Sequence, residues 1–149
     1  MRFENSQGWI EIEFENYAED SEFWRSGLVD ERNSVELGFN FSLEEIGWGC
    51  VGEEYFLTTD IKELATGAAK VLFSSIKEFS YSVAFPYGVL LDTEFCKFRF
   101  SRCENGIEVN LRIWDGLCEY IEITQIFDDQ GFEAIVQDLK EATKRFHVR

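Results

Sequence analysis

The segment Ile107-Glu108-Val109-Asn110-Leu111-Arg112-Ile113-Trp114 is the clearest structural signal in this sequence. Apolar and polar residues alternate along it with the period of a strand that buries one face. Asn105-Gly106 precedes it and predicts a tight hairpin with a strand over residues 94–102, because both residues of such a turn adopt positive φ. Asp115-Gly116 then leads into a third strand over residues 118–127. We therefore predict an antiparallel β-sheet meander with one apolar face to cover.

The covering element is predicted at the C-terminus, where apolar residues repeat on one helical stripe. This stripe consists of Phe132, Ile135, Val136, Leu139, Ala142 and Phe146. Acidic residues suit the positive N-terminal end of a helix, and basic residues suit its negative C-terminal end. The acids here are Asp128 and Asp129, and the basic residues are Lys140, Lys144 and Arg145. We predict a helix over residues 130–146 that lies on the sheet.

The N-terminal half predicts further strands and a first helix. Alternation indicates strands over residues 9–17, 35–43 and 49–57, with a low-regularity segment at 18–32 that contains one short strand near 27–30. Apolar residues at helical spacing then predict a helix over residues 60–73. Asp60 is its expected N-cap, and Glu63 is the expected acid of a capping box.

A strand over residues 79–85 separates this helix from the meander. The element order is therefore strands, helix, strands, helix. We predict an α+β fold in which a curved antiparallel β-sheet meander packs with two α-helices. No linker or internal repeat divides the sequence, so residues 1–149 are predicted to form a single domain.

The chain carries a net charge of −15 at pH 7. Residues 1–60 hold 15 acidic and 3 basic residues, which places most of the negative field in the N-terminal part. Because phosphate binding needs cationic side chains that displace counterions, we predict a basic protein partner and no nucleic acid.

No apolar run approaches the roughly 18 to 20 residues of a membrane span, and no signal peptide is evident. We predict a cytoplasmic protein without a membrane partner.

The sequence offers few residues suited to catalysis. Its only histidine, His147, stands near the C-terminus, where chains usually fray. No nucleophile elbow, phosphate-binding loop or zinc-protease motif occurs. The four cysteines form no C-x-x-C pair, and we interpret them as reduced core thiols: Cys50, Cys96, Cys103 and Cys118. We therefore predict no enzyme activity, no cofactor and no metal.

Trp24 lies in an acidic segment without regular period, Glu19-Asp20-Ser21-Glu22-Phe23-Trp24-Arg25. An aromatic residue among acids is typical of a surface that recognises a basic protein, with the aromatic as anchor and the charges steering the encounter. A solvated loop with one aromatic residue tucked inward is an alternative that stays open. The predicted partner-binding residues are Glu19, Asp20, Glu22, Trp24, Asp30, Glu31, Glu44, Glu45, Glu53 and Glu54.

The pattern of elements resembles the WapI family of bacterial immunity proteins. The resemblance covers most of the chain and consists of Trp9-Ile10-Glu11-Ile12-Glu13, Tyr55-Phe56-Leu57 leading into Asp60-Ile61-Lys62-Glu63-Leu64, the turn Asn105-Gly106, and Asp138-Leu139-Lys140 in the closing helix. It implies a protein that binds the toxin domain of a contact-dependent system and occludes its active site. No binding residue is carried over from that family.

The expected function is therefore that of a monomeric immunity protein that neutralises a cognate basic toxin, such as a nuclease. Two other classes stay open. One is a small-molecule-binding or carboxylate-based hydrolytic domain with an aromatic-lined cavity, which a pocket with two acids would reveal. The other is a structural subunit of a larger assembly, which a large exposed apolar patch would reveal.

Overall fold

Two four-stranded antiparallel sheets and two helices form the part of the chain described by the structure, a computed structural model covering residues 1–17, 34–44, 47–84, 94–114 and 120–147. The N-terminal sheet has the order β1 (Arg2–Asn5), β2 (Gly8–Tyr17), β3 (Ser34–Leu43) and β4 (Gly47–Leu57). The C-terminal sheet has the order β5 (Glu78–Ala84), β6 (Glu94–Cys103), β7 (Gly106–Trp114) and β8 (Tyr120–Phe127). Helix α1 (Thr58–Leu72) connects the sheets, and helix α2 (Asp129–Arg145) follows the last strand.

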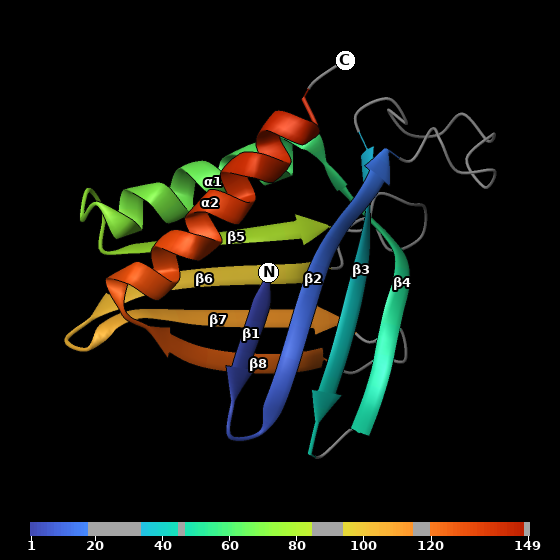
Figure 1. The fold of residues 1–149 in the computed structure, drawn as a ribbon, viewed down its shortest axis with the longest axis horizontal. Helices are drawn as coiled ribbons and strands as arrows, with labels where there is room; N and C mark the ends of the chain where they lie inside the picture. The colour runs from blue at the N-terminus through green and yellow to red at the C-terminus, as the bar shows by residue number, and fades with distance from the viewer. Residues whose placement is uncertain (18–33, 45–46, 85–93, 115–119, 148–149) are drawn as a thin grey trace.

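The sheets and helices share one hydrophobic core. Figure 1 shows the strands of the two sheets crossing each other, with α1 and α2 side by side over the C-terminal sheet. Aromatic rings join the layers: Phe56 meets Phe98 edge to face at 6.1 Å between ring centroids, and Phe100 meets Phe132 of α2 at 5.3 Å. Such pairs add to the stabilisation from apolar burial. The apolar face of the meander is therefore covered, as its alternation requires.

The predicted α+β fold with the order strands, helix, strands, helix is confirmed. Strand β1 was not predicted from the sequence, because its four residues are too few for their alternation to be recognised. β1 pairs with β2 and also reaches the other sheet, because the Asn5 side chain donates a hydrogen bond of 2.9 Å to the backbone carbonyl of Thr124. The strand expected near residues 27–30 lies outside the described residues.

The hairpin between β6 and β7 forms where it was predicted, but with a different turn. Cys103 pairs with Gly106, so the two loop residues are Glu104 and Asn105 rather than Asn105 and Gly106. Gly106 alone of these has positive φ, at 137°. A Cβ atom on this glycine would lie 2.0 Å from the backbone oxygen of Phe127, so the close approach of β8 requires glycine at this position.

Helix α1 begins earlier than predicted, and Asp60 has a different role. The N-cap position is Leu57, and Asp60 is the third helical residue, whose carboxylate accepts a hydrogen bond of 2.8 Å from the backbone N–H of Leu57. The other carboxylate oxygen accepts a hydrogen bond of 2.7 Å from the Tyr81 hydroxyl. Asp60 therefore acts as the capping-box acid that was expected at Glu63.

Helix α2 begins as its charge pattern predicted. Asp128 is the N-cap, and its carboxylate accepts a hydrogen bond of 2.7 Å from the backbone N–H of Gly131. At the other end, the guanidinium of Arg145 donates hydrogen bonds to the backbone carbonyls of Phe14 and Glu15. The last turn of α2 is thereby attached to β2.

The thiols of Cys96 and Cys103 differ in burial. Cys96 is a buried free thiol, as expected, and burial raises its pKa, whereas Cys103 is an exposed free thiol rather than a core residue. In the described ranges, no three His, Cys, Asp or Glu side chains are grouped to hold a metal ion, and no helix has the length and apolarity of a membrane span.

Candidate functional site

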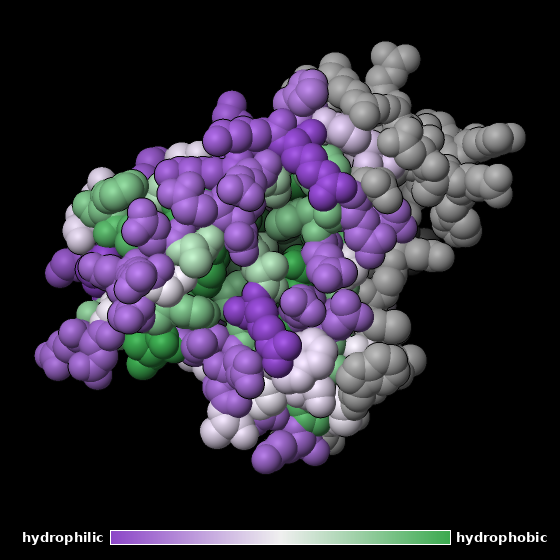
Figure 2. Space-filling view, in the orientation of Figure 1, coloured by the Kyte–Doolittle hydropathy of each residue, from purple (hydrophilic) through white to green (hydrophobic). Residues whose placement is uncertain are grey.

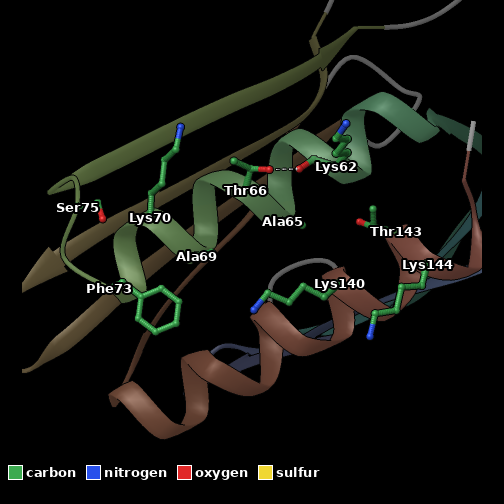
Figure 3. A pocket seen from close by; sticks show the side chains of 10 residues that line it. All are labelled: Lys62, Ala65, Thr66, Ala69, Lys70, Phe73, Ser75, Lys140, Thr143 and Lys144. Carbon is green, nitrogen blue, oxygen red and sulfur yellow. Dashed lines mark hydrogen bonds between the residues drawn. The ribbon is translucent and has the colours of Figure 1, made fainter.

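An open groove of about 540 Å³ lies between α1 and α2. Figure 3 shows two lysines on each helix: Lys140 extends toward Phe73, whereas Lys62 and Lys70 leave α1 on the side away from α2 and Lys144 leaves α2 on the side away from α1. We call it the lysine groove, and its lining residues are Lys62, Ala65, Thr66, Ala69, Lys70, Phe73, Ser75, Lys140, Thr143 and Lys144.

The helical repeat explains why these residues meet. The lining residues of α1 follow one another at alternating intervals of three and one, and Lys140, Thr143 and Lys144 do the same on α2. Residues three and four apart lie on one face of a helix. The opposite faces are apolar, with Ile61, Leu64 and Val71 among the buried residues of α1. Packing those faces on the core turns the lysine-bearing faces outward beside each other.

The floor of the groove is apolar and includes an exposed aromatic ring. Ala65 is buried, Ala69 is half-buried, and the side chains are short, which leaves the groove its depth. Phe73, just beyond the C-terminal end of α1, is 68 % exposed and is the most exposed large hydrophobic residue of the described chain. An apolar ring left in water beside a cationic rim is a surface suited to a planar, partly charged ligand.

The two threonines of the groove present acceptor oxygens. The Thr66 hydroxyl donates a hydrogen bond of 2.8 Å to the backbone carbonyl of Lys62, and the Thr143 hydroxyl donates one of 2.8 Å to that of Leu139. Each donor proton is therefore engaged within its own helix. The lysine ammonium groups consequently supply most of the free donors of the groove.

The lining of the groove is positively charged, whereas the chain as a whole is negatively charged. Its lining contains four lysines and no carboxylate, whereas the chain carries a net charge of −15. None of the four lysines forms an ion pair within the described part of the chain. Figure 2 shows hydrophilic side chains over much of this face, with hydrophobic patches between them. The groove is therefore a local cationic site on an acidic protein.

Arg102 of β6 fixes one end of the groove. Its guanidinium donates hydrogen bonds to the backbone carbonyls of Val71 and Leu72, at the end of α1 beside Phe73. It also forms an ion pair of 3.0 Å with Asp129, the first residue of α2. One side chain thus holds the end of one helix and the start of the other, and this sets the position of Phe73 relative to α2.

A second groove, of about 640 Å³, lies on the other flank of α2, against β2. Its charged side chains are mostly acidic. The acids are Glu11, Glu13, Glu15, Asp138 and Glu141, and the cations are Arg145 and the N-terminal ammonium of Met1. We call it the acidic groove. Helix α2 therefore separates a cationic groove from an anionic one.

The residues predicted to bind a partner do not form the lysine groove. Glu44 is exposed at the end of β3, where its backbone N–H donates to the carbonyl of Gln7. Glu53 and Glu54 lie in β4, of which the structure describes the backbone at these positions. The other seven predicted residues lie outside the described ranges: Glu19, Asp20, Glu22, Trp24, Asp30, Glu31 and Glu45.

The sequence did contain a signal for the groove. Lys140 and Lys144 are four residues apart on α2, and Lys62 and Lys70 are eight apart on α1, which places each pair on one face. Lys140 and Lys144 were predicted only to interact with the helix dipole, and no role was predicted for Lys62 and Lys70. The net charge, an average over the chain, concealed this local reversal of sign.

No protein-family model matches this chain, and a comparison with curated protein sequences found no match. Two solved structures share its fold. One is the plant transcriptional regulator PBF-2, with 11 % identity and a TM-score of 0.54 over 98 % of this chain and 80 % of that one. The other is WHY3 from Arabidopsis thaliana, with 12 % identity and a TM-score of 0.51 over 98 % of this chain and 86 % of that one.

These comparisons correct the expected function. The prediction of an immunity protein bound to a basic toxin is wrong, because the fold is that of a plant transcriptional regulator and neither similar structure is described as an immunity protein. The same comparison gives no support to the hydrolytic alternative. The prediction that nucleic acid is excluded is also wrong. It rested on net charge, whereas the helices gather four lysines into one groove. This chain is similar in fold to PBF-2 and to WHY3.

Proposed function

We propose that this chain is a non-catalytic domain that binds single-stranded nucleic acid in the lysine groove. One observation carries the proposal: four lysines without described ion-pair partners surround an apolar floor that ends in the exposed ring of Phe73. Grooves that bind single strands combine cationic side chains along the backbone with aromatic rings on which bases stack. The lysine groove contains both components.

The composition of the groove supports an unpaired strand over a duplex. The lysine ammonium groups stand at the ends of long, flexible side chains, within reach of phosphates on either kind of nucleic acid. The ring of Phe73 and the floor at Ala65 and Ala69 can be contacted by a base only when that base is free of its complement. A duplex would therefore use the lysines alone.

The shared fold adds a second line of support. PBF-2 is a transcriptional regulator, and regulation of transcription involves proteins that act on nucleic acid. The lining of the groove also suits binding without a reaction, since it consists of lysine, hydroxyl, aliphatic and aromatic side chains. None of its residues is a carboxylate, histidine or cysteine that would serve as a general acid, base or nucleophile in the usual arrangements.

The test measures binding of a fluorescently labelled single-stranded oligonucleotide by anisotropy, at salt concentrations from about 50 mM to about 200 mM. Each phosphate neutralised on a single strand contributes about −0.7 to the slope of log K against log salt. Four lysines therefore predict a slope of roughly −3, and Lys140→Gln/Lys144→Gln should reduce it to roughly −1.5 while weakening binding. An unlabelled duplex should compete less well than the unlabelled strand.

Lys97→Gln/Arg112→Gln is the matched control. It removes the same charge from β6 and β7, on the sheet face turned away from the helices, because the neighbours Phe98, Leu111 and Ile113 are buried on the inner face. This variant should bind nearly as well as the wild type. If the control lost affinity while the groove variant did not, the binding site would lie on the sheet, and the lysine groove would be the wrong assignment.

A further inference from the structure

The two flanks of α2 carry charges of opposite sign. Lys140 and Lys144 line the lysine groove, and Asp138 and Glu141 line the acidic groove. Because an α-helix with its side chains is about 10 to 12 Å across, these charges are about one helix diameter apart. The screening length at physiological salt is about 8 Å, so each flank is only partly screened from a ligand on the other.

The acidic groove keeps its negative charge. Its two cations are engaged with backbone carbonyls. The guanidinium of Arg145 donates a hydrogen bond of 2.6 Å to that of Glu15 and lies 4.8 Å from the ring centroid of Phe146, and the N-terminal ammonium of Met1 donates one of 2.7 Å to that of Ile12. None of its five carboxylates belongs to an ion pair in the described ranges of the chain. A polyanion that crossed α2 from the lysine groove would meet this row of charges.

The length of the lysine groove can be estimated from α1. Lys62 and Phe73 are eleven residues apart in sequence, which corresponds to about 16 Å along a helix. At about 3.4 Å for each phosphate of a stacked strand, this length holds about five phosphates, and an extended strand would place fewer there. Beyond these few nucleotides, a longer strand that turned over α2 would approach five carboxylates and only two cations, Arg145 and the Met1 ammonium, both of which donate to backbone carbonyls.

We propose that the acidic groove restricts the ligand of the lysine groove to a short unpaired segment of a few nucleotides, such as a strand end or a short oligonucleotide. This inference rests on the proposed function and specifies its substrate class. The lysine groove supplies the attraction, and the carboxylates of β2 and α2 limit how far a bound strand extends. An acidic protein can thereby bind nucleic acid locally without accumulating on long strands.

The test compares single-stranded oligonucleotides from about 3 to about 20 nucleotides with the wild type and with Glu13→Gln/Glu15→Gln. Both glutamates are exposed on β2, and glutamine preserves their size. Wild-type affinity should rise up to about five nucleotides and then stay level or fall. The variant should bind the longest strand several-fold more tightly than the wild type does, with less than about a twofold change for the shortest strand that binds.

Glu108→Gln/Glu122→Gln is the matched control, because it removes two charges from the outer faces of β7 and β8 and neither residue lines the lysine groove or the acidic groove. Its length profile should match the wild type. The inference is overturned if wild-type affinity keeps rising with length, if Glu13→Gln/Glu15→Gln leaves the profile unchanged, or if the control changes it equally. Absence of binding at every length, or binding insensitive to Lys140→Gln/Lys144→Gln, would instead overturn the proposed function itself.

Discussion

Arg102 donates a hydrogen bond of 2.7 Å from its guanidinium to the backbone carbonyl of Leu72, the last residue of α1. The final carbonyls of a helix have no partner within the helix, and a side chain that satisfies them stabilises that end. The same guanidinium reaches Asp129 at the start of α2. The helices that form the lysine groove are thus held together at one end by a residue of β6.

Replacement of this side chain should destabilise the fold. Arg102→Met should lower the free energy of unfolding by about 1 to 3 kcal/mol, because it removes donors from carbonyls that are partly shielded from water. The ion pair to Asp129 adds little, since that carboxylate is mostly exposed. Urea unfolding measures the change. Arg99→Met, which breaks an exposed pair with Glu78, is the control and should cost less than about 1 kcal/mol. Equal losses would contradict the role assigned to Arg102.

Gly67 lies inside α1, where glycine is normally unfavourable, and its presence has a steric cause. A Cβ atom at this position would lie 2.3 Å from the ring of Phe79 on β5. Gly67→Ala should therefore destabilise the protein by about 1 to 3 kcal/mol through overpacking, although alanine favours the helix by about 1 kcal/mol. Thermal or urea unfolding measures the change.

A double-mutant cycle tests the cause. In a Phe79→Ala background the ring is gone, so Gly67→Ala should become neutral or stabilising. If Gly67→Ala were equally destabilising in both backgrounds, contact with Phe79 would not explain the glycine.

The raised pKa of the Tyr81 hydroxyl predicts that the protein loses stability at alkaline pH. Burial, followed by the hydrogen bond to Asp60, raises the pKa of its hydroxyl above the usual value of 10.0. Above about pH 10 the unfolded state loses this proton while the folded state retains it, so stability falls as pH rises. The slope from this group is at most about 1.4 kcal/mol per pH unit, and less in practice because Tyr81 is only partly buried.

Tyr81→Phe isolates this contribution. Unfolding free energies measured between about pH 8 and about pH 11 should fall less steeply for the variant than for the wild type, because the variant lacks the hydroxyl whose proton the folded state retains. Parallel curves would show that Tyr81 ionises equally in the folded and unfolded states. The ultraviolet absorbance of tyrosinate gives an independent reading of the same titration.

Local sequence patterns predicted most of the fold, because each strand or helix that packs on the core must present one apolar face to it. Alternation along β7 and the apolar stripe of α2 each match one buried face, so both elements appear where the sequence placed them. Asp60 was placed at the wrong capping position because its carboxylate bonds across three residues and to Tyr81, a partner distant in sequence. The division into two sheets also escaped prediction, since it depends on which strands pair and not on the pattern within a strand.

The candidate site was less predictable for a related reason. Each lysine pair suggested only an exposed helix face, and the groove exists because α1 and α2 lie side by side in the folded chain. Lys144 near the end of α2 also had a sufficient local explanation in the helix dipole. The positive charge of the groove comes from two helices that meet only in the folded chain, so it cannot be read from the net charge. The acids of the N-terminal half were therefore predicted to bind the partner.

Phe73 provides the sharpest test of how the lysine groove binds. Because Phe73 is 68 % exposed, Phe73→Ala should leave the unfolding free energy nearly unchanged. Stacking of one base on an aromatic side chain contributes about 1 to 3 kcal/mol, so the same variant should weaken binding of a single strand by roughly 5-fold to 150-fold. The salt dependence should stay at the wild-type slope, since no charge is lost.

Phe73→Trp should retain or improve affinity. A loss of affinity in Phe73→Ala that Phe73→Trp did not restore, or an equal loss for a duplex, would mean that the ring supports the groove without stacking on a base.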